Sequence, residues 1–277
     1  MMLQPPAQAF PSCRRERVSA SVRPYGWRGI FPVLGLALAG CLAMQGPARA
    51  QEKVAKTSMI ELYTSQGCKS CPRADRNFAR YANDPHVLAL SFHVNYWDYM
   101  GWRDTLATQE NADRQTAYRR AQKARMVYTP QAIIDGRTQV NGRDMTAIEA
   151  QTAHRRLDVP VSIRQIDSNR LSIEIGAGEK PKTPLHVVLF YFRDPVTVPI
   201  TAGENAGQSV TYRNAVNGID TIGLWDGKPM KIELPTSELV RRKASGCAVA
   251  LQETAADDLP GPIHGGAIFK SSAPPAL

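Results

Sequence analysis

Two cysteines three positions apart, Cys68 and Cys71, are the residues of this sequence whose types and spacing point most directly to chemistry. A thiolate attacks disulfides, whereas a free cysteine with a pKa of about 8.5 is mostly protonated at neutral pH. A helix that begins at Cys68 would surround its sulfur with unpaired backbone N–H groups, and Lys69 adds a cation beside it. We therefore expect Cys68 to attack, and Cys71, one helical turn later, to resolve the mixed disulfide.

Two other uses of a cysteine pair compete with redox chemistry. A zinc site normally needs four ligands, usually two such pairs or one pair with two closely spaced histidines. The remaining cysteines and histidines do not have that spacing, so we expect no zinc site. A static disulfide that only staples the chain fits the same letters and stays an alternative.

A strand, a helix and a second strand are expected around the cysteines. An apolar run at residues 59–64 precedes them, and Pro72 falls in the first turn of a helix that we expect from Cys68 to about residue 84, where a missing N–H costs little. Residues 87–94 are mostly apolar, which suits a strand buried on both faces. This order favours a parallel pair with a right-handed crossover, and functional groups at the carboxyl ends of the strands.

The next residues predict two further helices and a hairpin. We expect a polar helix over residues 108–124 with Ala117, Tyr118, Ala121 and Ala124 facing inward, a strand over 131–134, an Asp135-Gly136 turn into a strand at 138–140, and a closing helix over 145–156 capped by Asp144.

Residues 58–157, with these elements, resemble a thioredoxin-fold domain. More narrowly, the runs ELYTSQGC from residue 61, SFHVNYWD from residue 91 and YTPQ from residue 128 resemble an uncharacterised family of secreted, thioredoxin-like bacterial proteins, and GENAG from residue 203 extends the similarity into the second half. The resemblance implies a fold and an export route but no established substrate.

The resemblance also implies a role for Thr129 and Pro130. Thioredoxin-like proteins carry a cis-proline that faces the cysteines, and the backbone of the residue before it can pair with a substrate strand. Thr129-Pro130 matches that position. An ordinary trans proline at the start of a strand is the alternative.

His93 and the aromatic residues after it form a second candidate group. His93 lies near the carboxyl end of the second expected strand, where its imidazole could lower the pKa of the Cys68 thiol or carry protons. A core histidine bonded to backbone is the competing interpretation. The aromatic stretch that includes Trp97 could bind a peptide or an apolar ligand, or it could be an anchored loop that covers the domain.

Residues 158–277 change in character, because short strands alternate with Gly, Pro, Asp and Asn clusters. Strands are expected at residues 161–166, 171–175, 186–192, 210–216, 230–234 and 247–252. They predict a small β-sandwich packed on the thioredoxin-like domain of residues 51–157. We expect Cys247 to be a buried small hydrophobe and residues 203–207 to form a turn.

The first 50 residues predict export. Arginines precede an apolar stretch at residues 30–44, and Ala48-Arg49-Ala50 matches the small-x-small rule, so we expect a secretory signal peptide cleaved after Ala50. A lipoprotein-type box, LAGC, offers lipidation of Cys41 as the alternative. The apolar stretch is shorter than the roughly twenty residues of a membrane span, so no span is expected. A periplasmic or secreted location follows, where disulfides can persist.

The charge of the chain does not indicate a nucleic-acid partner. The formal net charge is +9, but the first 50 residues hold six basic residues and one acidic residue, which leaves +4 for the rest. No nucleic-acid motif accompanies the basic clusters.

The sequence therefore predicts an exported thiol–disulfide oxidoreductase that acts on protein thiols or disulfides and needs no cofactor. A copper-binding protein is one alternative, because the Cys68 and Cys71 thiolates with His93 suit Cu(I). Sco-type copper chaperones combine such groups on a similar fold, but their cysteines are spaced by three residues. A non-catalytic binding module with a structural disulfide is the other alternative.

Overall fold

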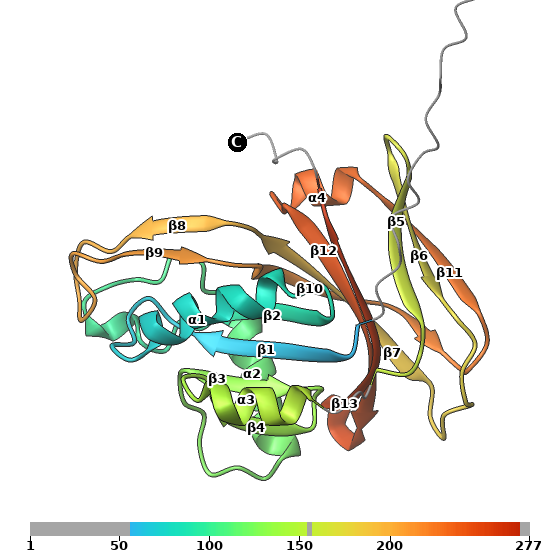
Figure 1. Ribbon diagram of the computed structural model, residues 1–277, viewed down its shortest axis with the longest axis horizontal. Helices are drawn as coiled ribbons and strands as arrows, with labels where there is room; N and C mark the ends of the chain where they lie inside the picture. Colours follow the sequence, from blue (N-terminus) through green and yellow to red (C-terminus); the bar gives the residue numbers. More distant parts are fainter. Residues whose placement is uncertain (1–55, 154–156, 272–277) are drawn as a thin grey trace, which may run out of the picture. The chain divides into compact units, whose positions relative to one another are not determined.

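Strands from both halves of the sequence join in one mixed sheet. The computed structural model describes residues 56–153 and 157–271, so the expected signal peptide and Cys41 lie outside the described residues. Eight strands pair in the order β13-β12-β7-β10-β2-β1-β3-β4 (Figure 1). In that order, their bounds are Leu259–Lys270, Gly246–Ala255, Leu185–Arg193, Ala215–Trp225, Val87–His93, Ser58–Thr64, Gln131–Ile134 and Thr138–Asn141.

Four helices accompany this sheet in the described part of the chain. They are α1 Cys71–Asn83, α2 Gln109–Ala121, α3 Met145–Thr152 and α4 Ser237–Arg241, with short 3-10 turns η1 Asp98–Met100 and η2 Ala256–Asp258. The protein is thus a mixed α/β fold. No helix among the described residues is long and apolar enough to cross a membrane.

The first half has the strand and helix order that the sequence predicted. β1 and β2 run parallel, and α1 connects them, while β3 is antiparallel to both β1 and β4. Asp135 and Gly136 form the hairpin turn with φ angles of 52° and 66°. The expected parallel pair and the expected hairpin are therefore confirmed.

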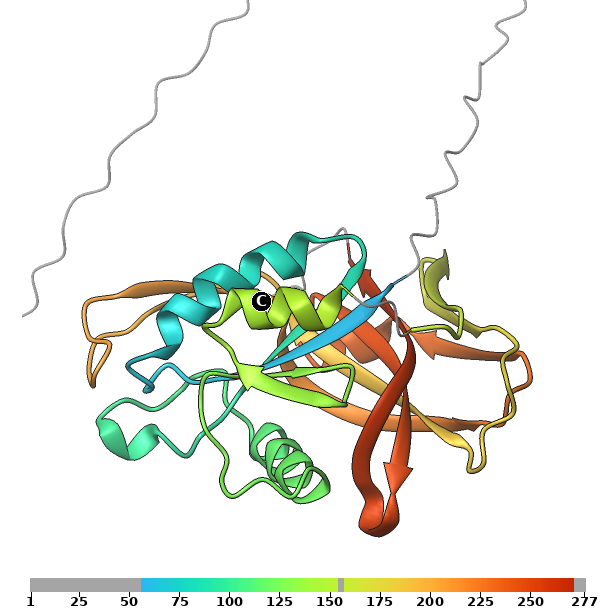
Figure 2. The same ribbon diagram turned by 60° about the horizontal axis from the view of Figure 1, so that its bottom comes forward.

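Helices cover both faces of this part of the sheet. Phe78 and Tyr81 of α1 and Ile148 of α3 pack with the β1 residues Ile60 and Leu62 on one face. α2 packs on the opposite face, where Ala112 and Tyr118 join a core built from β1, β2, β7 and β12. Figure 2 shows α1 and α3 together and α2 on the other side of the strands.

Three helix predictions need correction. α1 begins at Cys71, with Ser70 before it, because Cys68 and the residues after it form a turn closed by the bond from Cys71 N to Cys68 O, 3.1 Å. α3 ends at Thr152, and residues 154–156 lie outside the described part. The buried residues of α2 are Asn111, Ala112, Gln115 and Tyr118 instead of the expected alanines.

Polar partners inside the fold explain the buried face of α2. Asn111 donates to the carbonyl oxygens of His93 and Val216 at 3.1 and 3.2 Å, and Gln115 donates to that of Tyr128 at 2.9 Å. Buried amides are tolerated when they are bonded in this way. An apolar pattern alone could not reveal this face.

One buried ion pair crosses from α2 to β1. Arg114 Nε and Nη2 donate to the two carboxylate oxygens of Glu61 at 2.7 and 3.0 Å, and Nη2 also reaches Gln252 of β12 at 3.0 Å. Tyr118 donates to Glu61 at 2.6 Å. Glu61 is fully buried, so all of its charge is balanced inside the protein.

The second half is divided among three sheets. Four of its strands extend the large sheet, while β5 (Val161–Asp167), β6 (Arg170–Ile175) and β11 (Met230–Pro235) form a sheet of their own. Residues of β6 pack with those of β7 and β12 in one core, in which Cys247 is buried as expected. β8 (Val196–Pro199) and β9 (Ser209–Tyr212) form a two-stranded ribbon. The expected strand at 210–216 is interrupted at Asn214, whose φ is 46°.

β10 joins the two halves at the edge of β2. Ala215 pairs with Ser91 in parallel, and Ser91 N donates to Asn214 O at 3.0 Å. The side chains add two bonds, from Ser91 Oγ to Arg213 O at 2.9 Å and from Asn214 Nδ2 to Ala89 O at 2.8 Å. This short joint is reinforced on both strands.

Candidate functional site

Cys68 and Cys71 form a disulfide at the carboxyl end of β1. Their Cα atoms are 5.4 Å apart, and Cys71 is the first residue of α1. Cys68 is only 2% exposed and Cys71 is fully buried. A partner thiol therefore has almost no exposed sulfur to attack in this arrangement.

Thr129 and Pro130 lie against the disulfide. The Thr129-Pro130 peptide bond is cis, and the Thr129 carbonyl oxygen lies 3.7 Å from Cys68 Sγ. The Ser70 hydroxyl lies 3.4 Å from the same sulfur. The expected cis-proline is thus present, and the carbonyl of the residue before it lies against Cys68.

The aromatic loop is anchored to the cysteine turn. Trp97 Nε1 donates to Thr129 Oγ1 at 2.7 Å, and Trp102 Nε1 donates to Gln66 Oε1 at 2.8 Å. A Cβ atom at Gly67 would lie 3.1 Å from the Trp97 carbonyl oxygen, so the two segments are in close contact. Tyr99, stacked on Trp97, is 77% exposed. The anchored-loop interpretation accounts for these contacts, and Tyr99 offers a free aromatic surface beside them.

Asn205, from the loop between β8 and β9, holds the cysteine turn from the other side. Its side chain is buried, and Nδ2 donates to the carbonyl oxygens of Gln66 and Cys68 at 2.8 and 2.9 Å. The neighbouring Glu204 lies 3.5 Å from Lys69 in an exposed ion pair. Lys69 therefore points toward the second half of the chain, and the sequence prediction of residues 203–207 as a simple turn missed this contact.

Replacing Asn205 by alanine tests whether its side chain restrains the cysteine turn. The change removes both bonds of Asn205 Nδ2 and takes the donor away from the Gln66 carbonyl, while the Cys68 carbonyl keeps the bond from Cys71 N. A buried carbonyl that loses its donor costs about 1–3 kcal/mol of unfolding free energy. We also expect the disulfide to be reduced faster by a small dithiol, because the turn loses its restraint. Urea unfolding of the oxidised protein and the rate of reduction by dithiothreitol measure the two effects.

Asn217→Ala is the matched control. Asn217 Nδ2 likewise donates to a backbone carbonyl, that of Arg242, at 2.7 Å, but in a different part of the fold. The Asn217→Ala variant should be less stable, but its disulfide should be reduced at the wild-type rate. If the disulfide of Asn205→Ala is reduced at the wild-type rate, Asn205 does not restrain the cysteine turn.

His93 is paired with a buried carboxylate. Its Nδ1 lies 2.8 Å from Asp104 Oδ2, and both side chains are buried. Burial would lower the pKa of His93, but Asp104 raises it above its ordinary value. Burial would raise the pKa of Asp104, while His93 and backbone N–H groups lower it. The pairing with Asp104 therefore favours the protonated imidazole, and neither interpretation of the sequence named this carboxylate as the partner.

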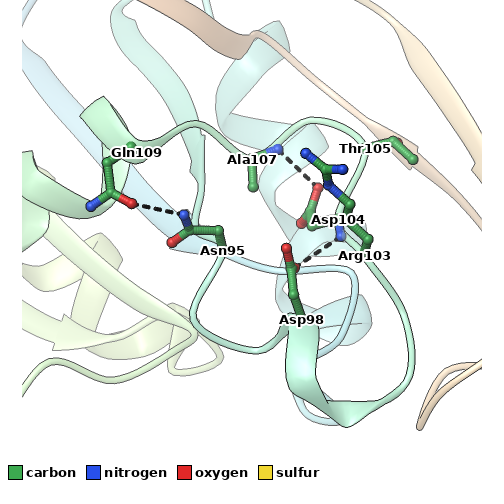
Figure 3. A pocket seen from close by; sticks show the side chains of 7 residues that line it. All are labelled: Asn95, Asp98, Arg103, Asp104, Thr105, Ala107 and Gln109. Carbon is green, nitrogen blue, oxygen red and sulfur yellow. Dashed lines mark hydrogen bonds between the residues drawn. The ribbon is translucent and has the colours of Figure 1, made fainter.

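A polar pocket lies next to this pair. It has a volume of 530 Å³, and Asp104 forms part of its lining together with Asn95, Asp98 and Arg103 (Figure 3). Asp98 accepts a bond from Asp104 N at 3.0 Å.

Within the described residues, no three His, Cys, Asp or Glu side chains come together to hold a metal, so the geometry gives no support to a copper site of Cys68, Cys71 and His93.

Comparison with known proteins places the chain in a family. The family described as "Protein of unknown function (DUF1223)" matches residues 59–252. The chain belongs to this family. A crystal structure of protein AGR_C_4864 from Agrobacterium tumefaciens, determined by a structural genomics consortium, is similar at 38% sequence identity and a TM-score of 0.70, covering 80% of this chain and 97% of that chain. No curated protein matches the chain.

The range that matches DUF1223 includes members of the site from both halves. It contains the two cysteines, the His93–Asp104 pair, Thr129-Pro130 and Asn205. In this DUF1223 protein, the residues that match the family model therefore include Asn205, which contacts the cysteine turn from the second half of the chain.

Proposed function

We propose that this protein is an exported thiol–disulfide oxidoreductase. Cys68 and Cys71 would exchange with protein thiols or disulfides on a thioredoxin-like domain of residues 51–157, and the β-sandwich-like region of residues 158–277 would help to select the partner. The observation that supports this most is the disulfide itself, because it joins the turn after a buried parallel strand to the first residue of α1.

The chemistry needs only the two sulfurs and the substrate. In the reducing direction, the Cys68 thiolate attacks a substrate disulfide, and one substrate sulfur leaves with the electron pair and takes a proton. Cys71 then attacks Cys68 Sγ, and the second substrate sulfur leaves in the same way. The protein pair gives two electrons to the substrate, and the reverse sequence oxidises a substrate dithiol.

Thr129, Pro130 and Trp97 would shape the approach to Cys68 Sγ. The Thr129 carbonyl oxygen lies 3.7 Å from that sulfur, and the Trp97 indole donates to the Thr129 hydroxyl. Because Cys68 is 2% exposed, a substrate has to displace some of the residues around it before a bond to Cys68 Sγ can form. We propose Lys69 and His93 as auxiliary groups only, since each has another partner, Glu204 and Asp104.

A purely structural disulfide is the competing function. The loop-entropy account gives a bridge that spans so few residues only about 2 kcal/mol of stabilisation. This stabilisation is small, so a purely structural role explains the presence of two cysteines at this position only weakly.

The equilibrium reduction potential of the Cys68–Cys71 pair tests the proposal. It is measured on the chain without residues 1–50, by redox buffers, thiol trapping and mass spectrometry. A value of about −120 to −180 mV supports an oxidase or isomerase, and one of about −270 mV supports a reductase. A pair that stays oxidised below about −300 mV would favour the staple.

The proposed export has its own test. Mass spectrometry of the amino terminus of the protein made in a bacterial host should give a chain that begins at Gln51. A lipidated Cys41 at the amino terminus would replace the cleavage after Ala50 by a membrane anchor.

A further inference from the structure

The 530 Å³ pocket beside the His93–Asp104 pair has two charged groups of opposite sign in its lining that do not pair. One is the half-buried carboxylate of Asp98, and the other is the exposed guanidinium of Arg103 (Figure 3). Among the residues that the structure describes, neither group forms an ion pair, with the other or with a third side chain. Both charges are therefore available to a ligand in the pocket.

Asp104, the third charged residue of the lining, is already fully bonded. Its Oδ2 atom accepts from Gln66 N at 2.8 Å and lies 2.8 Å from His93 Nδ1. Its Oδ1 atom accepts from the backbone N–H groups of Leu106 and Ala107 at 2.8 and 3.1 Å. These bonds use the acceptor positions of both carboxylate oxygens, so Asp104 holds the pocket together and has no position left for a ligand.

The other polar groups of the lining are held in place without a ligand. Asp98 Oδ1 accepts from Asp104 N at 3.0 Å, which fixes the carboxylate and leaves Oδ2 with no hydrogen bond from the described residues. Asn95 Nδ2 donates to Gln109 Oε1 at 2.9 Å, and Gln109 Nε2 donates to Asp113 at 2.8 Å. Figure 3 shows the bonds at Asp98 and at Asn95 on the two sides of the pocket. A site whose groups are already oriented pays less ordering entropy on binding.

The charges of the lining favour a ligand that carries both signs. A simple anion at Arg103 would meet the carboxylate of Asp98 in the same pocket, and a simple cation at Asp98 would meet Arg103. Like charges brought together oppose binding, whereas a molecule with an ammonium and a carboxylate group can place each beside the opposite charge. A guanidinium donates two parallel bonds to a carboxylate, and an ammonium has three donors, one of which suits Asp98 Oδ2.

The volume of the pocket limits the size of this ligand. Small-molecule sites have volumes of about 300–1,000 Å³, and 530 Å³ lies within that range. We propose that the pocket binds a small zwitterion, a free amino acid or a short peptide, with its amino group at Asp98 and its carboxylate group at Arg103. The site uses neither cysteine, so it goes beyond the proposed function and is tested independently of thiol–disulfide exchange.

Calorimetric titration of the protein with L-alanine, L-alanyl-L-alanine and tri-L-alanine measures the binding. These probes carry the two charged groups that the proposal needs, and the tightest of them decides between an amino acid and a peptide. Each probe is compared with two capped forms. The N-acetyl form keeps only the carboxylate group, and the amide form keeps only the amino group. Each capped form should bind about 10- to 100-fold more weakly, as expected for the loss of a charged hydrogen bond.

Two variants assign the contacts to residues. Asp98→Asn keeps Oδ1 as the acceptor for Asp104 N, so the loop is expected to fold. It should weaken binding of the free probe by about 10- to 100-fold without weakening that of the N-acetyl form. Arg103→Met keeps the apolar stem of the side chain, and should weaken the free probe as much without weakening the amide form. Structural damage to the pocket would instead weaken every form of the probe alike.

Asp226→Asn and Arg241→Met are the matched controls. Both residues are exposed and belong to ion pairs elsewhere in the fold, with Lys228 and Glu238. Binding of every probe should be unchanged in these variants. The proposal is overturned if none of the three free probes binds at concentrations above about 1 mM, or if a capped form binds as tightly as its free probe. A uniform loss of all probe forms in Asp98→Asn and Arg103→Met would overturn the assignment of the two contacts as well.

Discussion

Cys68→Ser is expected to lower thiol–disulfide exchange to the rate of the solution without protein, and Cys71→Ser to accumulate mixed disulfides. The difference arises because Cys68 forms the bond to the substrate, whereas Cys71 only breaks it. Exchange is followed with a model disulfide, and the trapped species are identified by mass spectrometry at Cys68. Both variants lose the same disulfide, so a staple would make them behave alike.

Cys247→Ser is the control for these variants. Cys247 is fully buried on β12, and burial raises the pKa of its thiol to about 12, which keeps the sulfur protonated. Exchange should be unchanged in this variant. Wild-type exchange in Cys68→Ser would remove Cys68 as the attacking thiol.

Arg114→Met is expected to cost about 3–5 kcal/mol of unfolding free energy, the usual consequence of leaving a buried charge without its partner. The guanidinium makes two bonds to Glu61 and lies over the Phe190 ring, 5.0 Å from its centroid. Its removal strands the Glu61 carboxylate in the core between α2 and the sheet. Urea unfolding of the variant measures the loss.

Two variants define the cause of that loss. Arg120→Met, on the same helix, removes an exposed pair with Asp257 at 4.0 Å, and should change stability by about 0–1 kcal/mol. Adding Glu61→Gln to Arg114→Met should recover part of the lost stability, because the uncompensated charge is gone. A double variant no more stable than Arg114→Met would show that packing, and not charge, explains the effect.

Local patterns predicted the elements that carry the cysteines. The apolar runs at residues 59–64 and 87–94 became β1 and β2, and Asp135-Gly136 became the hairpin turn. These features depend on residues close together in the sequence. The start of α1 was misplaced, because a helix that begins at Cys68 would have Pro72 as its fifth residue, past the first turn. With the observed start at Cys71, Pro72 is the second residue, where its missing N–H costs no helical bond.

The residues that complete the site could not be found in the same way. Asn205 bonds to Cys68 across 137 positions of the chain, and no local pattern reports such a contact. The same holds for the pairing of β10 with β2.

The joint between β2 and β10 bears on how the protein is made. The ribosome releases residues 87–93 long before residue 215, so an unfinished chain holds β1 and β2 but not the strand that covers the outer edge of β2. In such a chain, the unpaired edge of β2 exposes backbone N–H and C=O groups beside the apolar side chains of Leu88, Leu90 and Phe92. This edge can pair with the same strand of another unfinished chain. The length of chain between residues 93 and 215 therefore sets how long nascent copies have to be kept apart.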